Sequence, residues 1–185
     1  DWKQFRGNNK DAISTASDLP LWSEKAPELA WKKKIGSGFS EIIVSDNKIY
    51  IAYADSVDGK GGEYIMACDV ETGNKIWSSK IDSLYIDPEK WGDGNRSTPA
   101  VDEENVYCFS AFGKFVALSI KDGSEVWKVD FAKDFDSKFP RYAYTSSPLL
   151  IDNVLFMETG GQDGKSFTAF DKKTGKAIWS KNSGE

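Results

Sequence analysis

The sequence predicts an all-β fold built from repeated four-stranded antiparallel sheets, and three observations support this prediction. First, a pattern that begins with Ala and ends with Trp recurs at 67–77, 117–127 and 169–179. Second, short runs rich in Val, Ile, Tyr and Phe alternate with turns rich in Asp, Asn and Gly. Third, no window shows a convincing helical period. Such a repeat indicates one supersecondary unit that stacks against copies of itself.

Each repeat unit divides into four predicted strands. The strands of the first unit are expected at 42–44, 49–54, 64–69 and 75–79. Those of the second unit are expected at 99–101, 106–111, 115–120 and 125–129. Those of the third unit are expected at 148–151, 154–159, 167–171 and 176–180. Four-stranded antiparallel sheets that recur every ~45–50 residues are typical of β-propeller blades.

Glycine and proline positions support this division. One place in each unit, in the turn before the fourth strand, is held by Gly73, Gly123 and Gly175. A short hairpin loop that ends in a residue with positive φ favours glycine there. Pro99 and Pro148 open the first strands of their units. Because proline cannot donate to a sheet ladder, we expect these first strands to lie at a sheet edge.

The tryptophans occupy one fixed position in each unit. A large flat side chain at such a position can fill the gap between neighbouring blades. We therefore expect a structural docking role for Trp31, Trp77, Trp127 and Trp179. Trp31 lies in a segment that resembles the end of a unit without its beginning. The predicted organisation is one partial propeller domain with an N-terminal extension at 1–27, a closing strand at 28–35 and blades at 40–80, 97–130 and 146–181.

Composition limits the possible functions. The 185 residues suffice for one domain. With 24 basic and 29 acidic residues, the chain lacks the basic surface expected of a nucleic-acid partner, and we expect no membrane span. The absence of histidine excludes Ser-His-Asp and Cys-His catalysis and His-ligated metals. Cys68 and Cys108 are expected to be free buried thiols, with a disulfide as the alternative.

The repeated Ala-x-Asp-x-x-Thr-Gly-x-x-x-Trp pattern resembles the tryptophan-docking motif of the pyrroloquinoline-quinone-like propellers. The opening residues Asp1–Gly7 resemble the start of a bacterial subfamily of secreted propellers of this type. The superfamily includes quinoprotein alcohol dehydrogenases and an outer-membrane assembly lipoprotein, so the fold alone does not fix the function. The resemblance covers nearly all of the chain and implies an extracytoplasmic, periplasmic or secreted, bacterial protein. Because such propellers have more blades than this chain supplies, the remaining blades are expected in cis or on a second chain in trans.

The candidate binding residues lie on segments that cross from one blade to the next. We expect such segments at 36–41, 84–98 and 131–147. The candidates for ligand or partner binding are Tyr85, Trp91, Arg96, Arg141, Tyr142 and Tyr144. Aromatic and arginine side chains on long loops are typical of binding surfaces. The alternative is that the aromatic side chains cover the mouth of the core and the arginines pair with nearby aspartates.

We expect no metal site and no cofactor. Asp55, Asp58 and Glu63 could form an oxygen cage in a glycine-rich stretch, but their spacing is not that of an EF-hand, and a solvated hairpin loop is the expected structure. For the dehydrogenases, the resemblance implies a vicinal Cys-Cys disulfide, a Ca²⁺ held by Glu and Asn, and a catalytic Asp. The chain has no Cys-Cys pair, so no catalytic residue is assigned. Pyrroloquinoline quinone with Ca²⁺ is the alternative.

Three functional hypotheses follow. The preferred one is a non-catalytic extracytoplasmic scaffold or binding module, whose loop face takes a protein partner or a small ligand. The first alternative is part of a pyrroloquinoline-quinone-dependent dehydrogenase of alcohols or sugars. The second alternative is a glycan-binding propeller, because exposed aromatic side chains on loops can stack on sugar rings.

Overall fold

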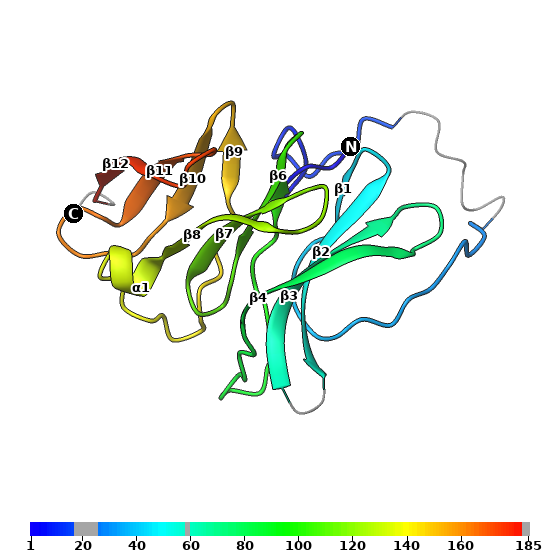
Figure 1. The fold of residues 1–185 in the computed structure, drawn as a ribbon, viewed down its shortest axis with the longest axis horizontal. Helices are drawn as coiled ribbons and strands as arrows, with labels where there is room; N and C mark the ends of the chain where they lie inside the picture. Colours follow the sequence, from blue (N-terminus) through cyan, green and yellow to red (C-terminus); the bar gives the residue numbers. More distant parts are fainter. Residues whose placement is uncertain (17–25, 58–59, 183–185) are drawn as a thin grey trace.

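Three four-stranded antiparallel sheets, here blades 1 to 3, make up the computed structural model, which describes residues 1–16, 26–57 and 60–182 (Figure 1). Blade 1 consists of β1 (Ile43–Ser45), β2 (Lys48–Val57), β3 (Lys60–Asp69) and β4 (Lys75–Ser83). Blade 2 consists of β5 (Ala100–Val101), β6 (Asn105–Phe109), β7 (Lys114–Ser119) and β8 (Glu125–Asp130). Blade 3 consists of β9 (Leu149–Ile151), β10 (Val154–Glu158), β11 (Phe167–Asp171) and β12 (Ala177–Lys181). This confirms the predicted all-β partial propeller of antiparallel blades.

Strand order within each blade follows chain order, so β1, β5 and β9 are edge strands. Pro99 and Pro148 directly precede β5 and β9. At these positions no backbone N–H has to donate to the sheet, so proline is tolerated. The turn glycines have positive φ, with values of 66°, 73° and 67° at Gly73, Gly123 and Gly175. The expected turn chemistry therefore agrees with the structure.

The β2–β3 hairpin, β4 and one short helix depart from the expected elements, and β4 extends to Ser83 beyond its predicted end at 79. The β2–β3 hairpin is longer than predicted, because the pairing continues through Ala54↔Glu63 and Asp55↔Gly62. The stretch expected as a solvated loop is thus strand on both sides, and Asp58 lies outside the described residues. A short helix, α1 (Phe131–Asp134), follows β8, where no helix was expected, and the Asp130 carboxylate accepts a hydrogen bond from its third residue.

The N-terminal segment runs across the innermost strands of all three blades. The backbone of Trp2 pairs with that of Val44 in β1, and the Lys3 carbonyl accepts from the Val101 N–H in β5 at 2.9 Å. The Gln4 side chain accepts from a backbone N–H in β9 at 3.1 Å. Figure 1 shows the N-terminus beside β1. The first residues therefore connect strands that are distant in sequence.

The hydrophobic core lies between blades rather than within one sheet. One cluster joins blades 1 and 2 through residues that include Tyr50, Trp77 and Val116. A second cluster joins blades 2 and 3 through residues that include Tyr107, Trp127, Phe115, Leu155 and Phe170. Cys68 and Cys108 are both buried and free. No described helix is long and apolar enough to cross a membrane.

At each boundary between blades, an indole lies against the turn of the next blade. The Trp77 Nε1 donates to the Ile120 carbonyl at 3.1 Å, and the Trp127 Nε1 donates to the Lys172 carbonyl at 2.9 Å. A β-carbon added at Gly123 would lie 2.5 Å from the Trp77 ring, so the glycine lets the ring approach the backbone.

The segment 28–35 pairs with no strand among the described residues. Its expected partner is a blade beyond the three described here, so its role as a closing strand stays a prediction. Trp31 in this segment donates to the Val70 carbonyl of blade 1 at 3.0 Å.

Candidate functional site

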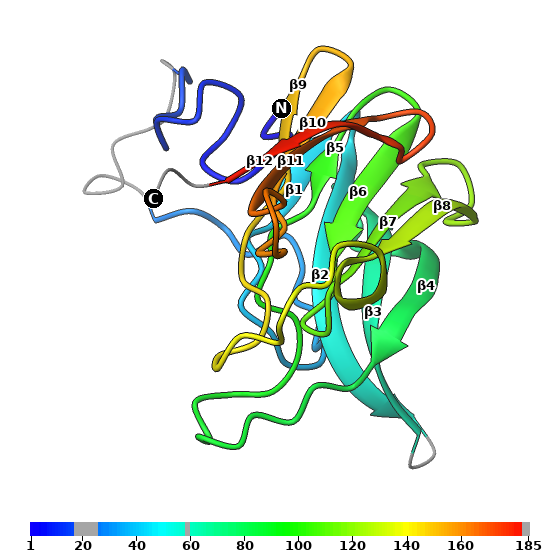
Figure 2. The ribbon, with the colours of Figure 1, turned by 90° about the vertical axis from the view of Figure 1, so that its left-hand side faces the viewer.

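The two long crossing loops, at 84–98 and 131–147, lie on the same side of the molecule (Figures 1 and 2). An ion pair joins them, in which the Arg141 Nη2 lies 3.1 Å from the Glu89 Oε1. These loops carry four largely exposed apolar side chains, which we call the loop-face patch: Ile86, Trp91, Phe139 and Tyr142. Trp91 is 76% exposed. Exposed aromatic side chains on a rigid support are typical of contact surfaces.

Of the six residues that the sequence suggested for ligand or partner binding, three are exposed and three are packed in the interior. Trp91, Arg141 and Tyr142 are exposed on the loops. Tyr85 and Tyr144 are buried, and the Arg96 side chain is only 13% exposed. Sequence reasoning did not single out Ile86 and Phe139, although both lie in the loops it identified.

Phe139 packs against two buried tyrosines and the partly buried Phe112. Its ring centroid lies 6.2 Å from that of Tyr85, 5.8 Å from that of Phe112 and 5.9 Å from that of Tyr144. The Tyr144 hydroxyl donates to the Ser137 Oγ at 2.8 Å, which fixes its ring. The buried tyrosines therefore hold an exposed ring in place rather than presenting a surface themselves.

The first crossing loop is folded around the buried carboxylate of Asp87. This carboxylate accepts from the backbone N–H groups of Glu89 and Trp91 at 3.0 and 2.9 Å, and the Arg96 guanidinium lies 3.0 Å away. Burial alone would raise the pKa of Asp87, but these N–H donors and Arg96 outweigh burial and lower it. The guanidinium also lies 4.9 Å from the Phe39 ring centroid. The backbone that carries Trp91 is thus fixed by charge-assisted hydrogen bonds.

Glu63 lies buried where blade 1 meets blade 2. Its side chain has no exposed surface, and its Oε2 accepts from the Ala111 N–H at 2.9 Å. Its Oε1 has no hydrogen-bond partner among the residues that the structure describes. Burial is the main cause that raises the pKa of Glu63 to about 7, and the nearby Asp82 carboxylate adds to it.

The expectation that Glu63 lies in a solvated loop is therefore wrong. Glu63 belongs to β3, and its side chain continues the alternation of that strand and points inward. Among the described residues, no group of three or more Asp, Glu, Cys or His side chains gathers as a metal site would need. Nothing in the sequence distinguished Glu63 from an exposed acid, because its burial depends on the next blade.

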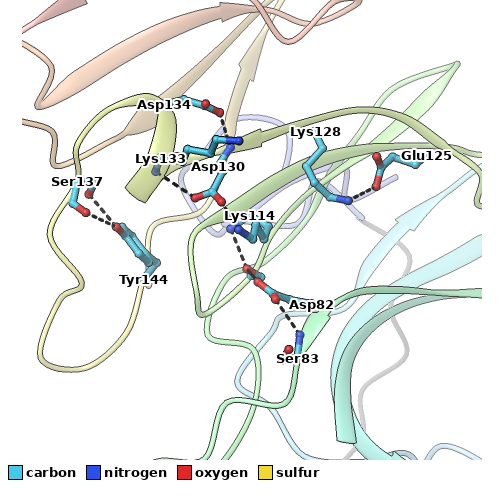
Figure 3. A network of polar contacts seen from close by, with 11 residues as sticks. Asp82, Ser83, Lys114, Glu125, Lys128, Asp130, Lys133, Asp134, Ser137 and Tyr144 are labelled. Atoms are coloured by element: carbon cyan, nitrogen blue, oxygen red, sulfur yellow. Dashed lines mark hydrogen bonds and ion pairs between the residues drawn. The ribbon is translucent and has the colours of Figure 1, made fainter. Parts of the chain in front are cut away.

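A polar network continues from β4 to the second crossing loop (Figure 3). The Ser110 hydroxyl donates to the Asp82 carboxylate at 2.6 Å. The Lys114 ammonium forms an ion pair with Asp130, whose other oxygen caps α1. Since each of these groups is occupied by a structural partner, the network fixes the loop rather than offering an activated nucleophile.

A cavity of about 460 Å³ lies between the N-terminal segment and the entries to β5 and β9. Its lining includes the cationic side chains of Arg6, Lys10 and Arg96, the Phe39 ring and several hydroxyl groups. The Arg96 Nε is buried and has no hydrogen-bond partner within 1–16, 26–57 and 60–182. Cationic and hydroxyl donors beside an aromatic ring suit an anionic planar ligand. Arg6 and Lys10 escaped the sequence analysis because only the fold brings the N-terminus to these loops.

Comparison with known proteins gives four informative matches. The family model described as outer membrane protein assembly factor BamB matches residues 61–185. The lupanine 17-hydroxylase [cytochrome c] of Pseudomonas sp. is 27% identical over 184 residues, which cover 94% of this chain and 25% of that protein. The quinohemoprotein alcohol dehydrogenase from Comamonas testosteroni has a TM-score of 0.68 at 20% identity, covering 97% of this chain and 26% of that one.

The BamB from Moraxella catarrhalis has a TM-score of 0.52 at 18% identity, covering 80% of this chain and 37% of that chain. At these identities, the solved structures establish the propeller fold alone. The chain spans about a quarter of the length of the curated relative that it matches.

Proposed function

Because the chain belongs to the family described as outer membrane protein assembly factor BamB, we propose that it is a non-catalytic, protein-binding propeller module that works outside the bacterial cytoplasm. Its binding surface is the loop-face patch, flanked by Arg141. The name of the matching family, a factor in protein assembly, supports a protein as the partner.

The observation that carries this proposal is the contrast between the patch and its support. Trp91 and Phe139 are exposed, whereas the groups beneath them are buried and bonded. A surface that is already ordered loses little conformational freedom on binding, which favours affinity. Exposed aromatic side chains are also the residue type most enriched at interface hot spots.

The experiment is affinity capture from envelope extracts of the source bacterium, with the tagged full-length protein as bait. The test variant combines Trp91→Ser, Phe139→Ser and Tyr142→Ser. We expect the wild-type protein to retain a discrete partner that the test variant loses, because one or two such anchors carry most of the binding energy of an interface.

The matched control variant combines Ile76→Ser, Val126→Ser and Ile178→Ser. These side chains are also about half exposed, but they lie on the outer strands β4, β8 and β12. The control should keep the partner. Equal retention by the test variant and the control would remove the loop-face patch as the binding surface.

The second candidate function is part of a quinone-dependent dehydrogenase, and the cavity between the N-terminal segment and the entries to β5 and β9 favours it specifically. Pyrroloquinoline quinone is a planar polyanion that would supply the redox chemistry when bound. Arg6, Lys10 and Arg96 would face its carboxylates, and Phe39 would face its ring. The described residues fit the organic cofactor, whereas they gather no cluster of acidic ligands for Ca²⁺, so no step is assigned to a metal in this chain.

Dye-linked oxidation of alcohols and sugars by the full-length protein, after loading with the quinone and Ca²⁺, tests this second candidate. Turnover that is lost in Arg96→Ala would favour the dehydrogenase over the binding module. The glycan hypothesis rests on exposed Trp91 and Tyr142 alone and stays a prediction.

A further inference from the structure

Glu63 lies at the base of the first crossing loop, between blades 1 and 2. Its Oε2 accepts from the Ala111 N–H in the turn between β6 and β7 at 2.9 Å. The Tyr85 backbone N–H and the Asn95 side chain also face this carboxyl group. Tyr85 and Asn95 stand near the two ends of the loop 84–98, so one buried side chain lies against both ends of that loop.

Hydrogen bonds close the base of the first crossing loop at the same place. The Gly94 N–H donates to the Tyr85 carbonyl at 2.9 Å, and the Asn95 Nδ2 donates to the Phe109 carbonyl of β6 at 2.7 Å. Trp91, the most exposed member of the loop-face patch, lies between these two anchor points. The arrangement of the part of the loop that carries Trp91 therefore depends on a closed base.

The second crossing loop rests on the same support. The Ala111 carbonyl accepts from the Tyr144 N–H at 3.1 Å, and Ala111 packs with Tyr85 and Ala143 in a small buried cluster. Ala143 has a φ of 65°, a conformation that an alanine keeps only when the surrounding structure holds it. A change at Glu63 is therefore transmitted to both loops, directly to the first and through Ala111 to the second.

The surroundings of Glu63 oppose a negative charge. The side chain has no exposed surface, and its Oε1 lacks a hydrogen-bond partner in the described part of the chain. The Asp82 carboxylate faces it from β4 and accepts from the Ser110 hydroxyl at 2.6 Å. Figure 3 shows the Lys114 ammonium beside Asp82, and this ammonium pairs with Asp130. The loop and the β6–β7 turn present only uncharged amide groups to Glu63.

Loss of the proton from Glu63 favours opening of the loop base. Burial, together with the Asp82 charge, raises the pKa of Glu63 to about 7. The closed base therefore binds the proton more tightly than an open base that admits water to the carboxylate, and closure weakens as the pH rises through about 7. Asp87, the buried carboxylate within the loop, pairs with Arg96 and has a lowered pKa, so it stays ionised over this range.

We propose that Glu63 is a proton-dependent switch for the loop-face patch. While its carboxyl group is protonated, both crossing loops are held in the arrangement that binds the protein partner. When the group is ionised, the loop base opens and the affinity for the partner falls. This switch rests on the proposed binding function, because the loop-face patch is the surface that it regulates. Binding and protonation are reciprocal, so binding of the partner to the closed loops raises the affinity of Glu63 for its proton.

Hydrogen–deuterium exchange of the full-length protein without a partner, at pH 5.5 and pH 8, tests the switch. After correction for the intrinsic exchange rate, the Trp91 and Gly94 amides should lose protection roughly 25-fold at the higher pH, because the carboxyl group regains its ordinary pKa of 4.5 in the open state. Glu63→Gln should keep these amides protected at both pH values. Glu71→Gln is the matched control, since Glu71 is an exposed acid of the same blade, and it should behave as wild type.

Two results of the exchange experiment would overturn the proposal. Protection of the loop amides that is equal at both pH values would show that Glu63 does not control the loop. A loss that is equal in the loop and in β6 would show that pH acts on the whole fold instead. If circular dichroism shows that Glu63→Gln does not fold, Asp82→Asn takes its place. This variant removes the neighbouring charge and should reduce the loss of protection, and an unchanged loss would count against the switch.

Affinity capture at the two pH values separates the switch from the proposed binding function. Wild type should retain the partner better at pH 5.5 than at pH 8, whereas Glu63→Gln should retain it equally at both. Capture that fails at both pH values while the loop still opens would contradict the proposed function alone. Equal capture by wild type at both pH values while the loop opens would overturn the regulatory role of Glu63.

Discussion

Replacing Glu63 by glutamine should remove a large part of the pH dependence of stability. The carboxyl group is buried beside Asp82, and its pKa rises from 4.5 to about 7 on folding. The folded state therefore binds this proton more tightly than the unfolded state. The stability gained from the proton is complete below the unfolded pKa and is lost as the pH rises through about 7.

The size of the effect follows from the two pKa values. Each pKa unit corresponds to about 1.4 kcal/mol, so the free energy of unfolding should fall by roughly 2–3 kcal/mol between pH 5 and pH 8 because of Glu63. Glutamine stays neutral, and its amide oxygen can still accept from the Ala111 N–H. The stability of Glu63→Gln relative to wild type should therefore rise by the same amount over this range.

Urea unfolding followed by tryptophan fluorescence at pH 5, 6, 7 and 8 measures this difference. The chain contains no histidine, so few other side chains change charge in this range. Glu158→Gln is the matched control, because Glu158 is exposed on β10. A relative stability of Glu63→Gln that does not vary with pH would refute the argument that burial raises the pKa of this group.

Three further predictions concern packing. Trp127→Ala should lower the free energy of unfolding by ~3–5 kcal/mol, because it opens a cavity between blades. Trp91→Ala should change the free energy of unfolding by less than about 0.5 kcal/mol. Equal thermal midpoints of the two variants would contradict this prediction. Gly175→Ala should destabilise more than Gly164→Ala in the same urea assay, because both have positive φ but only Gly175 contacts an indole, that of Trp127. The Cys108 thiol, whose pKa burial raises well above normal, should react with a thiol reagent only after unfolding.

Most of the fold could be predicted from the repeat, because the residues that define each unit lie close together in the sequence. Alternation around Ala117 and Trp127 predicted their strands, and the positive φ at Gly123 followed from the need for a tight turn. The ends of β2 and β3 could not be predicted in the same way. Gly61 and Gly62 suggested a loop, whereas both pair with β2, and Gly62 also pairs with Ser83 of β4.

For the candidate site, the sequence predicted which loops carry it but not which of their side chains are exposed. Their aromatic composition indicated a surface, but which rings are exposed depends on contacts between blades that the repeat does not encode. Tyr85 and Phe139 illustrate this, since one is buried and the other half exposed although they pack together. Arg6 lines the cavity at the entries to β5 and β9 only because the N-terminal segment crosses three blades.

Site-specific photo-cross-linking in living cells tests the proposed binding function most directly. A photoreactive residue replaces Trp91 or Tyr142 on the loop face, or Ile76 on the outer strand β4, in the full-length protein. The proposed function predicts one discrete cross-linked protein from both loop-face positions and none from Ile76. Cross-linking that is equal at all three positions, or absent from the loop face, would contradict it.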